Sequence, residues 1–163
     1  MPIRNIRQAG QLEIDATVRL RAYDGQYELA FDWHQNKELV WLVDGVKEAY
    51  SLEKLARMYR FLSENGECYW IEIREKCGWR PIGDVTLLAD DFAISIGDSR
   101  YWARGIGGKV LKRMIERAKE LGFTEIRVGE IYDWNIGSQR LFEKMGFSRL
   151  EKTEKGWSYK VTV

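Results

Sequence analysis

The sequence has little of what metal and redox chemistry usually needs. Its 163 residues include only one histidine and two cysteines. Cys68 and Cys77 have neither the spacing of a zinc site nor the second pair of a disulfide framework, so we expect two reduced thiols. His34 has no histidine partner, and no metal site is expected.

Strong net charge and long apolar runs are also missing. The formal net charge is +1, so no global field favours DNA, RNA or an anionic membrane as a partner. No segment approaches the ~20 apolar residues of a membrane span. The first ten residues lack the apolar centre of a signal peptide. We therefore expect a cytoplasmic protein without a nucleic-acid or membrane partner.

The length fits a single domain. A chain of 163 residues can bury a core without disulfides or metals. No repeat, linker or low-complexity stretch divides it. The prediction is one domain over residues 1–163, in which residues 1–10 form a loose terminus.

Hydrophobic periodicity predicts a chain of alternating strands and helices. The strand–helix–strand order over residues 92–131 predicts that the two strands are parallel, because a crossover connects them. The three strands before the crossover are joined by short turns and predict an antiparallel meander. The predicted fold class is α+β with a mixed, mostly antiparallel sheet. The expected helices cover residues 26–33, 36–43, 52–63, 106–121 and 135–145, and the expected strands cover 11–22 (one or two strands), 68–74, 81–88, 92–97, 125–131, 147–152 and 157–163.

A glycine-rich junction, Arg100–Lys109, stands between a predicted strand and a predicted helix. Glycine lets the backbone approach a ligand closely because it has no Cβ. A helix N-terminus offers unpaired N–H groups and about half a positive charge. The junction is therefore a candidate phosphate site, with a purely structural turn as the alternative.

Two familiar nucleotide-binding loops do not match this junction. A Walker A loop needs a glycine where Ala103 stands and a serine or threonine where Val110 stands. The dinucleotide fingerprint needs its third glycine at Val110 as well. The sequence therefore disfavours both ligand classes.

Two motifs resemble the GNAT N-acetyltransferase superfamily. The family's [Arg/Gln]-x-x-Gly-x-Gly pyrophosphate loop corresponds to Trp102–Gly107, and its Asn…Tyr-Glu-Lys-x-Gly-Phe segment corresponds to Asn135 and Phe142–Phe147. The resemblance covers about residues 81–150. It is closest to the branch that contains ribosomal-protein N-terminal and aminoglycoside acetyltransferases.

The resemblance implies a GNAT-like fold with helices on both faces of the sheet, and acetyl-CoA as the cosubstrate. The backbone of Arg104–Lys109 would wrap the pyrophosphate. The strand 92–97 would splay from the strand 125–131, and the pantetheine arm would lie in that gap. The coenzyme-binding residues implied in this way are Ile94, Ser95, Ile96, Arg104, Gly105, Ile106, Gly107, Gly108, Lys109, Asn135 and Phe142.

Two residues depart from the family pattern. Trp102 replaces the arginine or glutamine that opens the loop motif, which shifts the expected phosphate contacts to Arg104, Lys109 and the backbone. Phe142 replaces the tyrosine that often protonates the leaving thiolate. A thiol has a pKa of ~8.5, so one alternative is that the thiolate leaves without a dedicated acid. The other alternative is that water, Ser138 or Tyr132 supplies the proton.

Acetyl transfer to an amine also needs a proton acceptor. An alkylammonium has a pKa near ~10 and must lose a proton before it attacks. We predict Asp91 as the base or substrate anchor and Ser138 as a further catalytic residue. A lone histidine is more often structural, so His34 is not chosen. The candidate acids near the predicted strand 92–97 are Asp91, Asp98, Asp84 and Glu72.

The acceptor site is expected in the N-terminal half, by analogy with the family. Trp33, Trp41 and Tyr50 are the predicted substrate residues, because aromatic rings and acids suit a cationic amine. Packing of the tryptophans in the core is the alternative. The amine could belong to a protein N-terminus, an aminoglycoside-like compound or a polyamine.

The leading prediction is an acetyl-CoA-dependent N-acetyltransferase that works by direct attack in a ternary complex. A non-catalytic coenzyme A-binding or sensing module is the alternative that Phe142 supports. A third reading is a structural domain whose glycine loop binds nothing. Homodimers are frequent in the family, and the sequence leaves the oligomeric state open.

Overall fold

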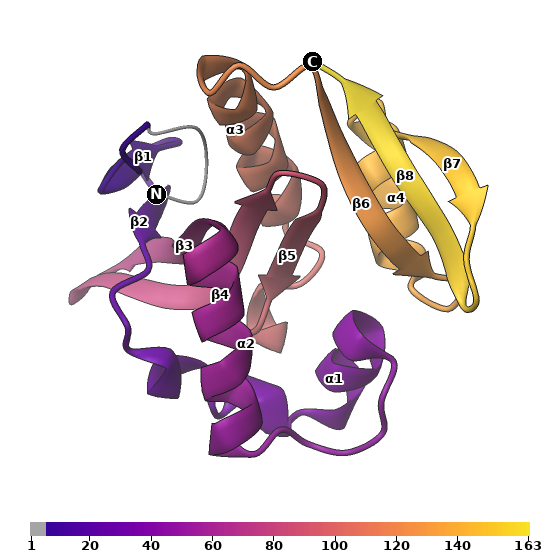
Figure 1. Ribbon diagram of the computed structural model, residues 1–163. Coiled ribbons are helices and arrows are strands. Elements are labelled where there is room, and N and C mark those ends of the chain that lie inside the picture. Colours follow the sequence, from indigo (N-terminus) through magenta and orange to yellow (C-terminus); the bar gives the residue numbers. More distant parts are fainter. Residues whose placement is uncertain (1–5) are drawn as a thin grey trace.

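The computed structural model describes residues 6–163 and contains two antiparallel sheets (Figure 1). One sheet has five strands in the order β1-β2-β3-β4-β5, and the other has three in the order β6-β8-β7. The strands are β1 (Gln11–Glu13), β2 (Val18–Ala22), β3 (Gly66–Glu75), β4 (Gly78–Leu88), β5 (Phe92–Ile96), β6 (Glu125–Tyr132), β7 (Ser148–Lys152) and β8 (Gly156–Thr162).

Four α-helices and three short 3-10 helices connect the strands within residues 6–163. Side-chain capping explains where three of these α-helices begin: Asn36, Ser51 and Asn135 each accept a hydrogen bond from a backbone N–H of the first turn. The helices are η1 (Tyr27–Ala30), η2 (Trp33–Gln35), α1 (Lys37–Asp44), α2 (Leu52–Asn65), η3 (Ser99–Tyr101), α3 (Ile106–Glu120) and α4 (Ile136–Lys144).

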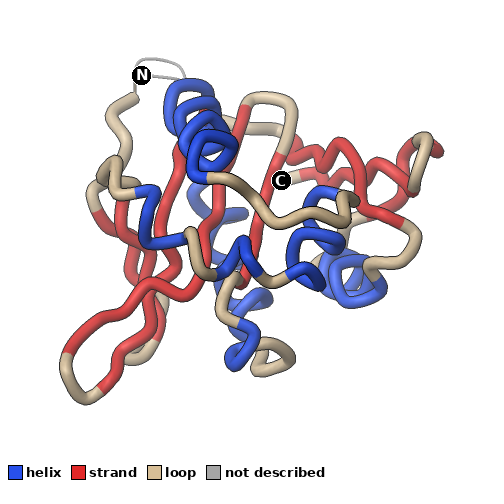
Figure 2. The backbone as a smooth tube through the Cα atoms, turned by 90° about the horizontal axis from the view of Figure 1, so that it is seen from below, coloured by secondary structure: helices blue, strands red, loops and turns tan. Residues whose placement is uncertain are grey.

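The helices cover both faces of the five-stranded sheet, which confirms the predicted α+β class (Figure 2). On one face, Val110 and Met114 of α3 join the larger core cluster with strand residues such as Ile71. On the other face, Tyr59 of α2 packs against Trp70 of β3 in a second cluster. The sheet is thus buried from two sides by helices that come from different halves of the chain.

The two strands around α3 lie parallel, as predicted, but they are not hydrogen-bonded to each other. In Figure 1, β5 and β6 run side by side in the same direction, but they belong to separate sheets, and no backbone hydrogen bond joins them in the described residues. The side chain of Asp91 bridges them instead. Its Oδ1 accepts from the backbone N–H of Phe92 at 2.8 Å and from that of Gly129 at 2.9 Å. The register of β6 also shifts between Val128 and Ile131. The splayed strands implied by the family resemblance are therefore present.

The N-terminal half differs from its predicted elements in detail. The expected helix over residues 26–33 is replaced by η1 and by η2, which lies mostly beyond it. α2 runs directly into β3, because Gly66 already has extended backbone angles. The part of the predicted loose terminus that covers residues 1–5 lies outside the described residues, whereas the side chain of Gln8 donates to the Cys68 carbonyl at 2.8 Å. No helix between residues 6 and 163 is long and apolar enough to cross a membrane.

Candidate functional site

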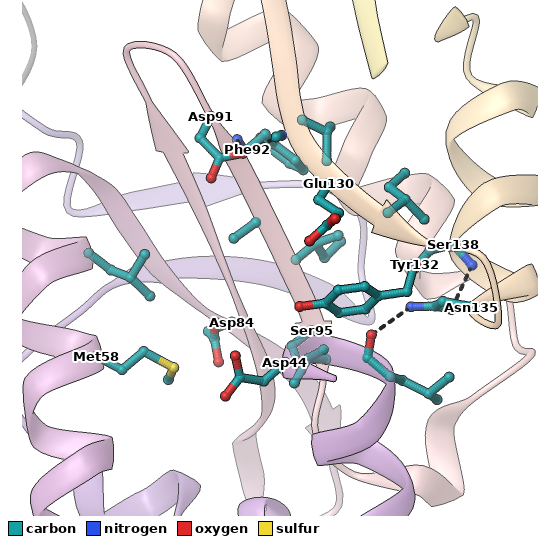
Figure 3. A pocket seen from close by; sticks show the side chains of 18 of the residues that line it. Asp44, Met58, Asp84, Asp91, Phe92, Ser95, Glu130, Tyr132, Asn135 and Ser138 are labelled. Atoms are coloured by element: carbon teal, nitrogen blue, oxygen red, sulfur yellow. Dashed lines mark hydrogen bonds between the residues drawn. The ribbon is translucent and has the colours of Figure 1, made fainter. Parts of the chain in front are cut away.

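A cavity of about 500 Å³ lies where β5 and β6 separate (Figure 3). One side of it comes from β5, β6 and α4, and the other side comes from α1, α2, β4 and the segments next to them. It is lined by His34, Leu42, Val43, Asp44, Tyr50, Met58, Leu62, Asp84, Asp91, Phe92, Ala93, Ile94, Ser95, Val128, Gly129, Glu130, Ile131, Tyr132, Asn135, Ser138 and Phe142.

The predicted β5 residues lie at this cavity in part. Ile94 and Ser95 line it, whereas Ile96 does not. β5 pairs with β4 along one edge only, so its other edge faces the gap and can pair with a ligand backbone. The carbonyl of Ile96 is already used: it accepts from the indole Nε1 of Trp102 at 2.6 Å. The residue that departs from the family motif therefore anchors the glycine loop to the end of β5.

The three predicted residues of the α4 region all line the cavity. Asn135 caps α4 through Oδ1, which accepts from Ser138 N at 3.2 Å, and its Nδ2 donates to the Leu42 carbonyl of α1 at 3.1 Å. Phe142 is 3% exposed and packs edge-on against Phe92 and Phe147. Asn135 therefore has both a capping role and a role in holding α1 against α4.

The three glycines of the predicted phosphate loop differ in whether the structure requires a glycine at their position. Gly105 precedes α3 with φ 77°, a left-handed conformation that glycine adopts without strain. A Cβ on Gly107 would lie 3.1 Å from Leu141 of α4, so glycine allows the two helices to approach closely. A Cβ on Gly108 would meet only ordinary contact, at 3.9 Å from Leu141. The first-turn N–H groups beside them have no acceptor within the helix, so the loop retains the donors that a phosphate needs.

The two predicted basic residues flank this loop outside the cavity. Arg104 is exposed, with its guanidinium 5.3 Å from the centre of the Tyr101 ring. The Nζ of Lys109 lies 2.7 Å from Oδ2 of Asp15 in the β1–β2 turn. This pairing holds the pKa of the Asp15 carboxyl well below its usual range. Lys109 therefore ties the N-terminal hairpin to the first turn of α3.

The predicted acceptor residues lie in different surroundings. Tyr50 lines the cavity and donates its hydroxyl to Oδ2 of Asp44 at 2.6 Å. Trp33 packs edge-on against Trp70 in the second core cluster. Trp41 stacks on Trp134, with ring centres 4.4 Å apart. Both tryptophans lie outside the cavity lining, in packing positions.

Asp91 stands at one end of the cavity. Its Oδ1 is occupied by the two backbone N–H groups that bridge β5 and β6. Figure 3 shows its side chain well separated from the labelled polar groups around Asp84. The structure thus gives this carboxylate an evident role in joining the two sheets.

Two buried residues that were weighed from the sequence but not predicted as site residues line the cavity. Asp84 of β4 is 4% exposed and accepts from the Tyr59 hydroxyl at 2.6 Å. His34 is 2% exposed, and its Nδ1 lies 2.9 Å from the Ala30 carbonyl, which can only accept. A signal for Asp84 was present in the sequence, because it is the one charged residue within the apolar run Ile82–Leu88.

Tyr132, at the end of β6, extends across the cavity. Its ring stacks on Trp134 with centres 4.7 Å apart, and Trp134 in turn stacks on Trp41. Figure 3 shows the Tyr132 hydroxyl directed toward Asp84, Asp44 and Ser95. Burial, followed by the nearby charges of Asp44 and Glu130, raises the pKa of this hydroxyl, so it remains protonated at neutral pH. In the part of the chain that the structure describes, no group of three or more metal-ligating side chains comes together.

A splayed strand pair beside a glycine-rich helix N-terminus, with a cavity of apolar side chains and a few carboxylates behind it, is the arrangement expected of a coenzyme A-dependent acetyltransferase. Residues 17–148 match the family model of the acetyltransferase (GNAT) domain. The chain therefore belongs to the GNAT family, and the predicted family is confirmed.

The chain is also similar to individual proteins and solved structures. An uncharacterised protein of Methanocaldococcus jannaschii is 25% identical, and the match covers 99% of this chain but 34% of that protein. The chain thus spans about a third of the length of this relative. A crystal structure of a domain from the same organism has a TM-score of 0.81 at 26% identity, with 91% of this chain and 100% of that domain covered. The aminoglycoside acetyltransferase AAC(6')-Ib in complex with coenzyme A has a TM-score of 0.72 at 18% identity, with coverage of 89% and 94%.

Proposed function

We propose that this chain transfers the acetyl group of acetyl-CoA to a primary amine of a small molecule or a protein N-terminus. The amine attacks the thioester directly while both substrates are bound. The observation that most supports this proposal is the gap between β5 and β6, which opens into the cavity lined by Asp84, Tyr132 and Asn135.

The coenzyme would occupy the side of the gap formed by β5, α3 and α4. The first-turn N–H groups of α3 would hold the pyrophosphate, and the free edge of β5 would pair with the amides of the pantetheine arm. The coenzyme A complex of a protein with a similar fold supports coenzyme A as the kind of ligand. The proposed contacts are Ile94, Ser95, Ile96, Arg104, Gly105, Ile106, Gly107, Gly108, Lys109, Asn135 and Phe142.

The acceptor would enter from the side of α1 and α2. Carboxylates line the cavity there, and none of the described lining residues is a lysine or an arginine. A cationic amine suits such a lining through charge pairing. Tyr50 would contribute from this side, while Trp33 and Trp41 would support the site through packing.

The proposal is tested by measuring release of the coenzyme A thiol from acetyl-CoA against a panel of amines. The panel contains peptides with free N-termini, aminoglycosides, polyamines and amino sugars. We expect at least one class to give amine-dependent thiol release together with the acetylated product by mass spectrometry. Binding of acetyl-CoA without turnover of any amine would contradict the proposal.

A non-catalytic coenzyme A-binding module remains the second candidate. The observation in its favour is Phe142, a buried ring without the hydroxyl that protonates the leaving thiolate in many relatives. Calorimetry with acetyl-CoA and with coenzyme A separates this candidate from a structural domain, because only a binding module produces heat with either ligand.

We predict that the Tyr132 hydroxyl supplies the proton that Phe142 cannot. Tyr132→Phe should lower kcat at least ~10-fold, since loss of a general acid typically costs 10²- to 10⁴-fold and a thiolate needs less help than most leaving groups. The KM for acetyl-CoA should be unchanged. Ser138→Ala is the matched variant for the other candidate hydroxyl. If Ser138→Ala lowers kcat and Tyr132→Phe does not, the proton comes from Ser138.

We also predict that Arg104→Gln weakens acetyl-CoA binding by about 3- to 10-fold. A partly solvated guanidinium beside a phosphate contributes of the order of 1 kcal/mol, and salt screens it. The measurement is calorimetry at low and high ionic strength, where the difference from the wild type should shrink with added salt. Lys112→Gln, an exposed change further along α3, is the control. Unchanged affinity of Arg104→Gln at low salt would remove Arg104 from the phosphate site.

A further inference from the structure

We propose that Asp84 is the general base of this acetyl transfer, and that Tyr59 is its positioning residue. The proposal rests on the proposed function, because it assigns the residue that receives the proton of the acceptor ammonium. It places the attacking nitrogen between Asp84 and Ser95, beside the strand along which the pantetheine arm is expected to lie.

The first argument is the position of Asp84 on the sheet. Asp84 of β4 is the direct cross-strand partner of Ser95 of β5. Cross-strand partners point to the same face, with Cβ atoms about 5 Å apart. Tyr59 of α2 reaches Asp84, so this shared face is the one toward α2 and the acceptor side. A carboxylate and a hydroxyl thus lie next to each other in the cavity lining.

The second argument is the hydrogen-bonding capacity that remains at this point. Oδ2 of Asp84 accepts from the Tyr59 hydroxyl, whereas its Oδ1 has no hydrogen bond to any residue between 6 and 163. The Oγ of Ser95 is fully buried and also lacks a partner among those residues. A buried polar atom without a partner, such as the Ser95 Oγ, is costly in a native protein. An ammonium nitrogen between the two groups would satisfy both, because a carboxylate and a hydroxyl can each accept.

The third argument is the electrostatic environment of Asp84. Tyr59 from α2, His34 from η2 and Cys68 from β3 interact with it, and the Tyr132 hydroxyl from β6 is directed toward it (Figure 3). Burial raises the pKa of the Asp84 carboxyl, and the Tyr59 hydrogen bond and His34 oppose this only in part. A carboxylate with a raised pKa is a stronger proton acceptor.

The other acids of the cavity already accept hydrogen bonds or ion pairs from the protein, as Glu130 does from the backbone N–H of Lys155 at 3.1 Å. Asp44 is paired with Lys54 Nζ at 3.1 Å and accepts from the Tyr50 hydroxyl at 2.6 Å. Asp91 is held by two backbone N–H groups. Each of these carboxylates therefore already serves to hold neighbouring parts of the protein together.

The proton balance of the step is complete without a further reactant. The carboxylate of Asp84 takes one proton from the bound ammonium, and the nitrogen lone pair then forms the C–N bond to the acetyl carbon. The C–S bond breaks as the tetrahedral oxyanion collapses, and its electron pair leaves with sulfur. The Tyr132 hydroxyl gives its proton to the thiolate and takes up the second proton of the nitrogen in return. Asp84 returns its proton to solvent before the next turnover.

The test begins with Asp84→Asn, which keeps the shape of the side chain and removes its basicity. With an amine that the wild type acetylates, kcat/KM should fall at least ~100-fold, with the affinity for acetyl-CoA unchanged. Asp90→Asn, an exposed acid in the β4–β5 turn outside the cavity, is the control and should retain full activity. A fall below threefold for Asp84→Asn would overturn the assignment.

The pH dependence separates a base from a merely structural residue. The acidic limb of kcat/KM against pH should report the Asp84 carboxyl in the free enzyme. Tyr59→Phe removes a hydrogen bond that favours the carboxylate, so the limb should move to higher pH. If the acidic limb of kcat/KM against pH is unchanged in both Tyr59→Phe and Asp84→Asn, the proposal is overturned.

A readout that needs no acceptor keeps the two proposals distinguishable. The carboxyl carbons of aspartate-labelled protein are titrated by NMR, and the resonance missing in Asp84→Asn identifies Asp84. The ordinary pKa of aspartate is ~3.9, and we expect the pKa of Asp84 to lie above it. A value at or below the ordinary pKa would overturn the assignment of Asp84 even if amines are acetylated. If no amine is acetylated but the pKa of Asp84 is raised, the proposed function fails, while the inference that burial raises the pKa of Asp84 is supported.

Discussion

Replacing Arg117 with methionine should destabilise the fold by about 3–5 kcal/mol, the usual cost of leaving a buried charge without its partner. Arg117 of α3 holds Glu67 of β3 through two contacts, Nε and Nη2, each 2.9 Å from a carboxylate oxygen. Glu67 is fully buried at 0% exposure, and the Tyr69 hydroxyl also donates to it at 2.7 Å. Without the guanidinium, one hydroxyl donor remains for a buried carboxylate.

Chemical denaturation measures this loss as a decrease in the free energy of unfolding. Arg127→Met is the matched control, since Arg127 pairs with Glu125 at 2.8 Å on the surface, where such pairs are worth about 0–1 kcal/mol. Glu67→Gln combined with Arg117→Met should recover part of the loss, because no unpaired charge is then buried. A loss below 1 kcal/mol for Arg117→Met alone would show that Glu67 finds another partner or takes up a proton at little cost.

Placing an acid at Gly108 should abolish acetyl-CoA binding while leaving the fold intact. Gly108 lies in the first turn of α3, where an aspartate is favourable to the helix and replacement of glycine restricts the unfolded chain. If the pyrophosphate sits at this helix end, a carboxylate about 4 Å away would cost several kcal/mol at the effective dielectric of a protein surface. We therefore expect Gly108→Asp to weaken binding at least ~100-fold, or about 2.7 kcal/mol.

Gly108→Asn is the matched control, because it has the same shape without the charge. A Cβ at this position meets only ordinary contact with Leu141, so both variants should keep the melting temperature of the wild type or exceed it. Calorimetry with acetyl-CoA compares the three proteins. Equal affinities of Gly108→Asp and Gly108→Asn would mean that no phosphate lies at this helix N-terminus.

The regular elements were predictable because each carries its own local signal. The apolar positions of α3 recur at the helical period, and Ser51 and Asn135 are residues that cap helices through their side chains. The strands β3, β4 and β5 are rich in β-branched and aromatic residues between turn residues. The segment of η1 and η2 was predicted as one helix, because its apolar spacing does not distinguish a helix from two short turns.

The coenzyme side was predictable for a similar reason, since its motif is contiguous. Gly105, Gly107 and Gly108 fall within four residues, and the Asn135 phrase follows after a fixed sequence of elements. The residues of the proposed acceptor side were not predictable in this way, because they come from separate elements of the chain. Asp84, His34 and Tyr132 are far apart in sequence, and Trp33 and Trp41 looked equally suited to a pocket or to the core.

The sequence by itself determined the family, the expected cosubstrate and the order of strands and helices, because these depend on local periodicity and on two contiguous motifs. Only the tertiary structure decided that β5 and β6 separate, since the bridge from Asp91 to Gly129 and the irregular register of β6 are long-range features. It also decided which carboxylate is buried beside an unpaired hydroxyl. The physical reason is that burial and hydrogen-bond supply depend on neighbours that the chain brings together only when it folds.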